Sequence, residues 1–267
     1  MGTALMANSN IDFRTSQSYA LGFGRSAALV AGTLNATAAR DLVLGRLNVN
    51  VEVPLNQNFG NITVLTVQGA SILCSNQPCS IRGFDTSLQM DENFVGVPLV
   101  QNGVTQVQWA NLPAAAAVSA ALYCDPWGSS LGEPPSPDES GPSSLNFAFG
   151  MGNIIIAAGA TVTLQATALR ACVLGRLYLE AFDPLAGGTF ANENQCQVTQ
   201  ILINQTEQLA SQVNAGVPLS AFGLNALSSM CNLNQFVPMN GTVSINIQNN
   251  TAATALTVGG HFFCNAS

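Results

Sequence analysis

Apolar and polar residues alternate with a period of two along several short stretches of the chain. Residues 47–53 read Leu-Asn-Val-Asn-Val-Glu-Val, and residues 243–248 repeat this alternation with Val and Ile on the apolar row. Successive side chains of a strand point to opposite faces, so each stretch predicts a strand with one face toward a core. Residues 62–67, 162–165 and 256–262 are further candidates, rich in β-branched or aromatic residues. The pattern predicts an all-β protein.

One stretch favours a short helix instead. Asn204 could serve as an N-cap with Glu207 three residues later, and Gly216 and Pro218 would end the helix soon afterwards. Short helices in the loops of a β-sandwich would not change the fold class.

The sequence contains a long internal repeat. Residues 36–47 and 166–177 are identical at nine of twelve positions, 130 residues apart. Both are preceded by similar leaders, Phe23-Gly24 and Phe149-Gly150, and both halves end with an Asn-Gly pair followed by an apolar run that finishes at a cysteine. A repeat of this length is too long for a solenoid unit. We interpret it as a tandem duplication of a whole β-sandwich domain.

A segment rich in Pro, Gly and Ser separates the two copies. Proline removes a backbone donor and glycine weakens a strand, so no central strand or helix is expected there. The predicted organisation is an N-terminal arm, a first jelly roll, a linker or long loop, and a second jelly roll, at residues 1–20, 21–124, 125–146 and 147–267 respectively.

Charge is scarce. Charged residues make up 8% of the 267 residues, the formal net charge is −7, and all seven basic residues are arginines. A chain of this charge repels polyphosphate, so direct binding of nucleic acid is not expected. An uncharged polar surface instead suits close contact with many copies of the same chain.

No targeting or membrane segment is expected. Residues 1–20 hold Asp12 and Arg14 and lack a continuous apolar stretch of signal-peptide length. The most apolar run, residues 154–160, is far shorter than a membrane span.

The usual equipment of an enzyme is missing. His261 is the only histidine, so any catalytic triad would have to use it, and a metal site with several histidine ligands is excluded. The carboxylate pairs Asp91-Glu92, Asp138-Glu139 and Glu180 with Asp183 are more typical of solvated loops than of a glycosidase cleft. We predict no catalytic activity, no metal and no cofactor.

Two groups of residues are candidates for contacts. Arg40 and Arg46 recur as Arg170 and Arg176, six residues apart in each copy, where they could share a strand face and bridge to carboxylates or backbone carbonyls within or between subunits. Cys74 and Cys79 enclose four residues, which allows a small disulfide loop between them. The alternative interpretation is that the cysteines are scattered buried thiols.

The duplicated sandwich with few charges resembles the double jelly-roll major capsid proteins of icosahedral viruses, especially membrane-containing bacteriophages. The likeness covers nearly the whole chain, and it depends on the repeat at residues 36–47 and 166–177 and on the shared Asn-Gly…Cys endings. It implies a homotrimer with six similar lobes that assembles into a shell.

The sequence therefore predicts a structural protein of a virion, assembled in the host cytoplasm. Its expected partners are copies of itself, penton or minor capsid proteins, and an underlying lipid membrane. The alternative is a tandem carbohydrate-binding or adhesin module, which would need exposed aromatic platforms, and the chain has only two Trp and three Tyr.

Overall fold

The computed structural model describes residues 19–27, 30–51, 60–84, 97–111, 118–126, 147–183, 194–209, 216–223 and 232–266. Within these ranges the chain consists almost entirely of strands and turns, with short 3₁₀ segments that include η1 (Ile81–Phe84) and η4 (Leu219–Phe222). No helix among the described residues is long and apolar enough to cross a membrane. Most of the predicted arm and linker, residues 1–18 and 127–146, lies outside the described residues.

The strands form two sets in the same order. The first set is β1 (Tyr19–Ser26), β2 (Gly32–Thr37), β3 (Leu42–Val51), β4 (Gly60–Val67), β5 (Ala70–Ser71), β6 (Cys79–Ser80), β7 (Val97–Leu99), β8 (Val104–Asn111) and β9 (Val118–Pro126). The second set is β10 (Phe147–Ile156), β11 (Thr161–Thr167), β12 (Cys172–Phe182), β13 (Cys196–Ile203), β14 (Thr206–Glu207), β15 (Val217–Pro218), β16 (Asn232–Val237), β17 (Thr242–Asn249) and β18 (Leu256–Ala266). Each strand of the first set has its counterpart in the second.

Each set builds two antiparallel sheets with the strand order of a jelly roll. We call the sheets with orders β1-β9-β3-β7 and β10-β18-β12-β16 the first and second A sheets. The sheets with orders β2-β8-β4-β5 and β11-β17-β13-β14 are the first and second B sheets, and β6 and β15 add to β4 and β13 respectively. The predicted fold class, all-β with two tandem jelly rolls from an internal duplication, is confirmed.

The repeat extends to the turn that the sequence marks with Asn-Gly. Asn102 and Asn240 both adopt a left-handed backbone, at φ 65° and 64°, which asparagine tolerates better than most residues. Their backbone N–H groups donate to Ala38 O and Ala168 O respectively, both at 2.8 Å. The same turn therefore ties the same connection to the rest of the sandwich in both copies.

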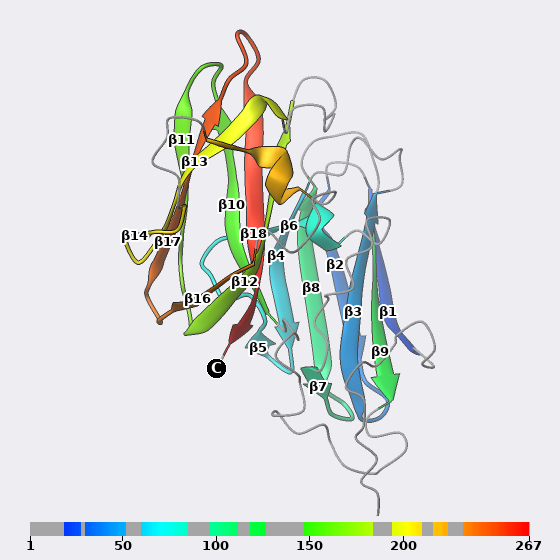
Figure 1. Cartoon of the computed structure of the whole chain (residues 1–267). Helices are drawn as coiled ribbons and strands as arrows, with labels where there is room; N and C mark the ends of the chain where they lie inside the picture. Colours follow the sequence, from blue (N-terminus) through cyan, green and yellow to red (C-terminus); the bar gives the residue numbers. More distant parts are fainter. Residues whose placement is uncertain are drawn as a thin grey trace, which may run out of the picture.

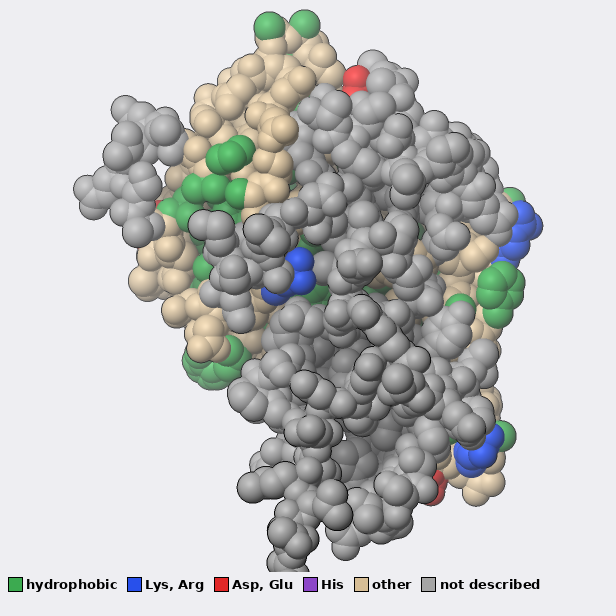
Figure 2. All heavy atoms as spheres, turned by 45° about the vertical axis from the view of Figure 1, so that its right-hand side comes forward, with side chains coloured by type: hydrophobic (Ala, Val, Ile, Leu, Met, Phe, Trp, Pro, Cys, Tyr) green, Lys and Arg blue, Asp and Glu red, His purple; other side chains and the backbone are tan. Residues whose placement is uncertain are grey.

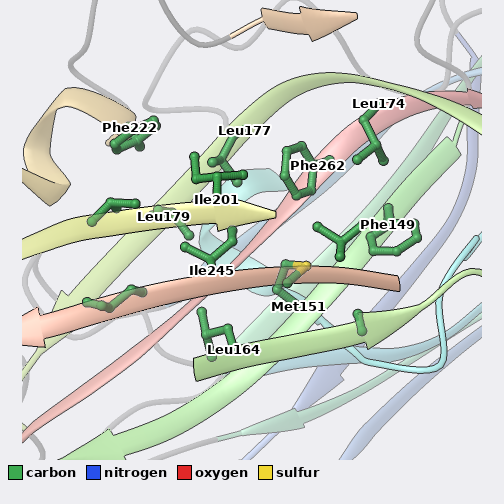
Figure 3. Close-up of a cluster of buried hydrophobic side chains, with 14 of the residues drawn as sticks. Phe149, Met151, Leu164, Leu174, Leu177, Leu179, Ile201, Phe222, Ile245 and Phe262 are labelled. Atoms are coloured by element: carbon green, nitrogen blue, oxygen red, sulfur yellow. The ribbon is translucent and has the colours of Figure 1, made fainter. Parts of the chain in front are cut away.

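A separate hydrophobic core fills each sandwich between its A and B sheets. The alternating rows predicted from the sequence point inward, and Leu47, Val49, Val243, Ile245 and Ile247 are all fully buried. In the second core the side chains from both sheets interdigitate (Figure 3). Burial of such a row drives the pairing of the two sheets.

The predicted helix after Asn204 is wrong. Asn204 and Gln205 have positive φ, 48° and 66°, and form a tight turn that leads into β14. The Glu207 carboxylate accepts backbone N–H bonds from Ile201, Gln208 and Leu209 at 3.0–3.2 Å, so it fixes a hairpin and not a helix N-terminus. Gln68-Gly69 makes the corresponding left-handed turn in the first copy.

Figure 1 shows the four sheets side by side, with the second B sheet at the left and the first A sheet at the right. The first B sheet and the second A sheet lie next to each other in the middle (Figure 1). The two jelly rolls therefore follow one another in the same orientation, front to back.

Candidate assembly interface

The two jelly rolls are joined mainly by residues 71–80 of the first, which we call the joint segment. It runs along β10, the edge strand of the second A sheet. Cys74 N donates to Ala148 O at 2.7 Å, Ala148 N donates to Ile72 O at 3.2 Å, and Gly152 N donates to Pro78 O at 3.1 Å. The joint segment thus satisfies backbone groups of a strand that would otherwise be an open sheet edge.

The joint segment also binds the connection between β11 and β12. Leu169 N donates to Cys74 O at 2.7 Å, Asn76 N donates to Thr167 O at 3.1 Å, and Thr167 N donates to Asn76 Oδ1 at 2.9 Å. Polar backbone from one jelly roll is therefore paired directly with backbone of the other, which fixes their relative position.

Gly150 lies where the joint segment comes closest to the second A sheet. Ser75 Oγ donates to Gly150 O at 2.7 Å. A Cβ atom at residue 150 would collide with the backbone of Gln77 and Pro78. Only glycine leaves room for this approach.

The four repeated arginines occupy two kinds of place. Arg170 precedes β12, and its Nη2 donates to Ser71 O of the joint segment at 2.7 Å while its guanidinium lies 5.1 Å from the centre of the Phe147 ring. Arg40 lies at the equivalent place before β3 and is exposed. Arg46 and Arg176 lie within β3 and β12, opposite Tyr123 and Asn232.

The prediction that each pair of arginines shares a strand face is wrong. Arg40 and Arg170 lie outside the strands, and β3 and β12 each carry a bulge next to the second arginine, between Leu44 and Arg46 and between Leu174 and Leu177. A bulge interrupts the alternation on which the prediction depended. Arg170 does contact a backbone carbonyl within the chain, which is one of the contacts that the sequence analysis allowed for these arginines.

A buried aromatic cluster completes the contact between the jelly rolls. Phe84 of η1 stacks on His261 of β18, with ring centroids 5.5 Å apart and planes at 12°. His261 also contacts Phe263 and Tyr178, at 4.9 and 5.2 Å between centroids, and Tyr178 OH donates to Glu180 Oε2 at 2.9 Å. Aromatic side chains bury large apolar areas, so this cluster adds apolar contact to the hydrogen bonds of the joint segment.

His261 is placed for packing. Its ring is fully buried, and neither nitrogen has a hydrogen-bond partner among the described residues. Burial, followed by the positive charge of Arg176, lowers the pKa of His261 to about 3. The imidazole is therefore neutral at physiological pH, and it packs against its neighbours as an aromatic ring does.

Three thiols meet where the joint segment enters the second core. Cys74 belongs to that core although it comes from the first jelly roll, and its neighbours are Cys172 and Cys264. Hydrogen bonds with Cys264 and then Cys74 lower the pKa of Cys172, whereas burial raises that of Cys264. Cys74 and Cys79 are both buried free thiols, so the disulfide that their spacing allowed is not formed in the structure.

The structure brings together no acid pair or metal ligand set in the part of the chain that it describes. No group of three or more His, Cys, Asp or Glu side chains among the described residues could hold a metal ion. Glu180 is buried in β12, and Asp183 follows the end of that strand. The pairs Asp91-Glu92 and Asp138-Glu139 lie outside the described residues.

The corresponding surface of the first jelly roll is open among the described residues. Phe23 pairs with Ala121, as Gly150 pairs with His261 at the equivalent place in the second copy. Phe23 is 68% exposed on the outer face of the first A sheet, whereas Gly150 is covered. Among the described residues, the outer face of the second A sheet is therefore covered at Gly150, and that of the first is exposed at Phe23.

Sequence comparison of the two leaders missed this difference. It places Phe23 opposite Phe149, but in the structure Phe149 points into the second core and is fully buried. The reason is a shifted bulge, which lies between Ala20 and Gly22 in β1 and between Gly150 and Gly152 in β10. The Phe-Gly dipeptides are thus displaced by one residue, which moves the side chain to the other face.

Comparison with known proteins gives a distant likeness to a solved structure. No protein-family model matches the chain, and no curated protein matches it significantly. Among solved structures it is similar to the STIV MCP, a major capsid protein, at 12% sequence identity and a TM-score of 0.42, over 93% of this chain and 96% of that one.

Proposed function

We propose that this chain is the major capsid protein of an icosahedral virus, a structural protein that acts by assembling with copies of itself. Three chains form a trimer whose six jelly rolls imitate a hexagon, and trimers tile a shell. The protein resides in the virion after assembly in the host cytoplasm. Minor or penton proteins, and an underlying membrane, are its further partners.

The observation that carries the proposal is the way the two copies meet. The first jelly roll contacts the outer face of the second A sheet through its own B-sheet side, so the contact joins two different surfaces. Such a heterologous contact can be repeated from copy to copy and closes into a ring when the rotation permits. A chain that holds two copies of the domain in this contact already contains one of the contacts that a ring of such domains needs.

Surface composition supports the same function. Few charged side chains lie on the described part of the face in Figure 2, and charged residues make up 8% of the sequence. Neighbouring copies with such surfaces can approach without strong like-charge repulsion.

The adhesin alternative finds no support in the one tryptophan that the structure describes. Trp109 is only 1% exposed, and its Nε1 donates to Ser26 Oγ at 2.9 Å. It is a core residue and not a platform for a sugar ring. Trp127 lies outside the described residues.

Electron microscopy of the purified chain in negative stain tests the proposal. We expect hexagonal capsomers, sheets or closed particles once the protein is concentrated. A monomer that stays dispersed at every concentration and ionic strength, and in the presence of lipid vesicles, would contradict a capsid function. A specific signal on a glycan array from such a monomer would favour the adhesin alternative.

A further inference from the structure

We propose that Cys74 of the joint segment and Cys172 of β12 form a site of oxidative modification, at which a small peroxide converts the two thiols into a disulfide that links the two jelly rolls covalently. The Cys172 sulfur reacts first, and Cys74 supplies the thiol that completes the bond. The role of this bond in a shell rests on the proposed function, but the bond itself can form and be measured in a single chain.

The Cys74 thiol lies among residues of the other jelly roll. Cys74 is fully buried and belongs to the second core. Two backbone bonds hold it there, because Cys74 N donates to Ala148 O and Leu169 N donates to Cys74 O, both at 2.7 Å. Leu169 lies three residues before Cys172, the first residue of β12, and the side chains of Cys74 and Cys172 hydrogen-bond to each other. The two sulfurs are therefore in contact before any oxidation.

The register of the second A sheet keeps Cys172 and Cys264 from bonding to each other. Cys172 lies opposite Ala266, and Cys264 lies opposite Leu174, so the two cysteines are diagonal neighbours offset by two residues. Diagonal neighbours on paired strands are about 7–8 Å apart, whereas Cα atoms joined by a disulfide are about 4.4–6.8 Å apart. Cys74 comes from outside this sheet and is not bound by its register, so it is the partner of Cys172.

Two differences between the repeat blocks concern this site. The blocks differ at three of their twelve positions, where Cys172 replaces Leu42 and Ala171 replaces Asp41 of the first copy. The first difference supplies a thiol. The second removes a carboxylate, whose negative charge would oppose a neighbouring thiolate. Both occur in the copy whose core receives the joint segment.

The surroundings of Cys172 favour its thiolate, which is the reactive form of cysteine. Hydrogen bonds with Cys264 and Cys74, together with the positive charge of Arg170, lower the pKa of Cys172 to about 4 against the opposing effect of burial. The pKa of Cys74 is raised to about 12, first by its hydrogen bond with Cys172. The site thus pairs a thiolate with a protonated thiol, which are the two forms that the reaction uses.

The reaction takes two steps. The Cys172 thiolate attacks one oxygen of hydrogen peroxide, the O–O bond breaks, and the hydroxide that leaves takes up a proton to become water. The Cys74 thiol then attacks the sulfenic sulfur of Cys172, which forms the S–S bond and releases a second water that carries the Cys74 proton. The two cysteines lose two electrons in total, and the peroxide is reduced to water.

The bond changes how the joint segment is held. Without it, hydrogen bonds and packing hold the segment against β10 and β12. A disulfide between residues 74 and 172 closes a loop of about 100 residues, and a cross-link over so long a loop restricts the unfolded chain strongly. Disulfides persist in oxidising surroundings and are rare in a reducing cytoplasm. We therefore expect a shell that assembles in the reduced form and becomes more stable once it is exposed to oxidants.

Peptide mapping of the full-length chain tests the site. The reduced protein is freed of reductant, treated with hydrogen peroxide, unfolded in the presence of iodoacetamide and digested without reduction. We expect a pair of peptides joined through Cys74 and Cys172, with the other five of the seven cysteines alkylated. A bond between Cys172 and Cys264, oxidation of Cys172 without any bond, or no reaction at these thiols would overturn the inference.

Single substitutions assign the roles of the thiols. Cys172→Ala and Cys74→Ala should each abolish the bond. Cys264→Ala keeps both bonding sulfurs but loses the strongest hydrogen bond that lowers the pKa of Cys172, so the same bond should form more slowly at neutral pH.

Cys196→Ala is the matched control for these variants. Cys196 is another buried thiol of the second core, and burial alone raises its pKa. This variant should form the bond at the rate of the wild type. Loss of the bond in Cys196→Ala to the same degree as in Cys74→Ala would show that the substitutions act through the fold, and it would contradict the assigned roles.

Unfolding in urea measures the effect of the bond and depends on no variant. The oxidised wild type should unfold at a higher urea concentration than the reduced wild type, and a thiol reductant should reverse the shift. Cys74→Ala should show no shift on oxidation. Equal midpoints for the two forms of the wild type, with the bond mapped, would show that the bond does not hold the jelly rolls together.

Assembly of the reduced wild type, observed by negative-stain microscopy, separates this inference from the proposed function. If the reduced chain assembles but peroxide forms no bond between Cys74 and Cys172, the inference is wrong and the proposed function stands. If the bond forms but neither the reduced nor the oxidised chain assembles, the proposed function fails and the oxidation site stands.

Discussion

The two A sheets share one architecture and have different surroundings. Both have the same strand order, and both carry bulges at nearly the same places. The outer face of the second holds buried Tyr178, His261 and Phe263 beneath the first jelly roll, whereas the first presents Phe23 at 68% exposure. In a duplicated domain the inner faces specify the fold, and the outer faces specify the neighbours.

The difference is visible at single positions. Gly150 admits backbone from the other jelly roll, and Phe23 at the same place cannot. His261 supplies a ring for Phe84 to cover, and Ala121 at the same place does not. Each substitution in the second copy adapts the sheet to a partner within the chain.

The largest effect is expected from removing the ring that covers the second A sheet. Phe84→Ala should lower the free energy of unfolding by about 3–5 kcal/mol, because it opens a cavity between His261 and Phe263. Phe236→Ala, at an exposed position, should change it by less than about 0.5 kcal/mol. Urea denaturation measures both, and similar values would show that Phe84 does not hold the jelly rolls together.

Exchanging the residues at the paired position is the next test. Gly150→Phe gives the second sheet the residue of the first and should cost about 3 kcal/mol, since it forces the joint segment away from β10. Phe23→Gly makes the reverse change and should cost about 1 kcal/mol, the usual penalty for glycine in a strand. Limited proteolysis within residues 71–80 should accelerate for Gly150→Phe alone. Equal rates of proteolysis for both variants would contradict the close approach of the joint segment to β10 at Gly150.

The pH dependence of stability probes the buried histidine. The pKa of His261 is lowered to about 3 in the folded chain, below its ordinary value of 6.5, so the folded state resists protonation. Its neutral form therefore contributes stability above pH 6.5, and that stability is lost as the pH falls, by about 1.4 kcal/mol per pH unit. His261→Phe should abolish this share of the acid sensitivity. Parallel pH profiles for the variant and the wild type would contradict it.

The smallest effect concerns the three thiols. Cys74→Ala should lower the free energy of unfolding by about 1 kcal/mol and should raise the pKa of Cys172, because one of the hydrogen bonds that lowers it is lost. The thiolate absorbance near 240 nm, followed against pH, measures that shift. An unchanged titration would mean that Cys74 of the joint segment does not hydrogen-bond to Cys172 in the second core.

Much of the fold could be predicted because its signals are local. The alternation around Ile245 and the repeat at residues 166–177 each lie within a few residues, and both survive in the folded chain. The helix after Asn204 failed because its cap signal also suits a left-handed turn, and only pairing with β13 decides between them.

The joint could not be predicted from the sequence. Ser75, Asn76 and Gln77 look like an ordinary loop, and their partners lie about 75–90 residues away in β10 and β11. The bulges that set which side of the sheet Phe23 faces depend on β9, about 100 residues further on. Nothing within a short window of sequence reports on such contacts.

Native mass spectrometry of the intact 27.7 kDa chain tests the central claim most directly. If the contact between the jelly rolls recurs between molecules and closes, the dominant assembled species contains three chains. A dimer related by twofold symmetry, an open series without a preferred number, or a chain that is single at every concentration would contradict it.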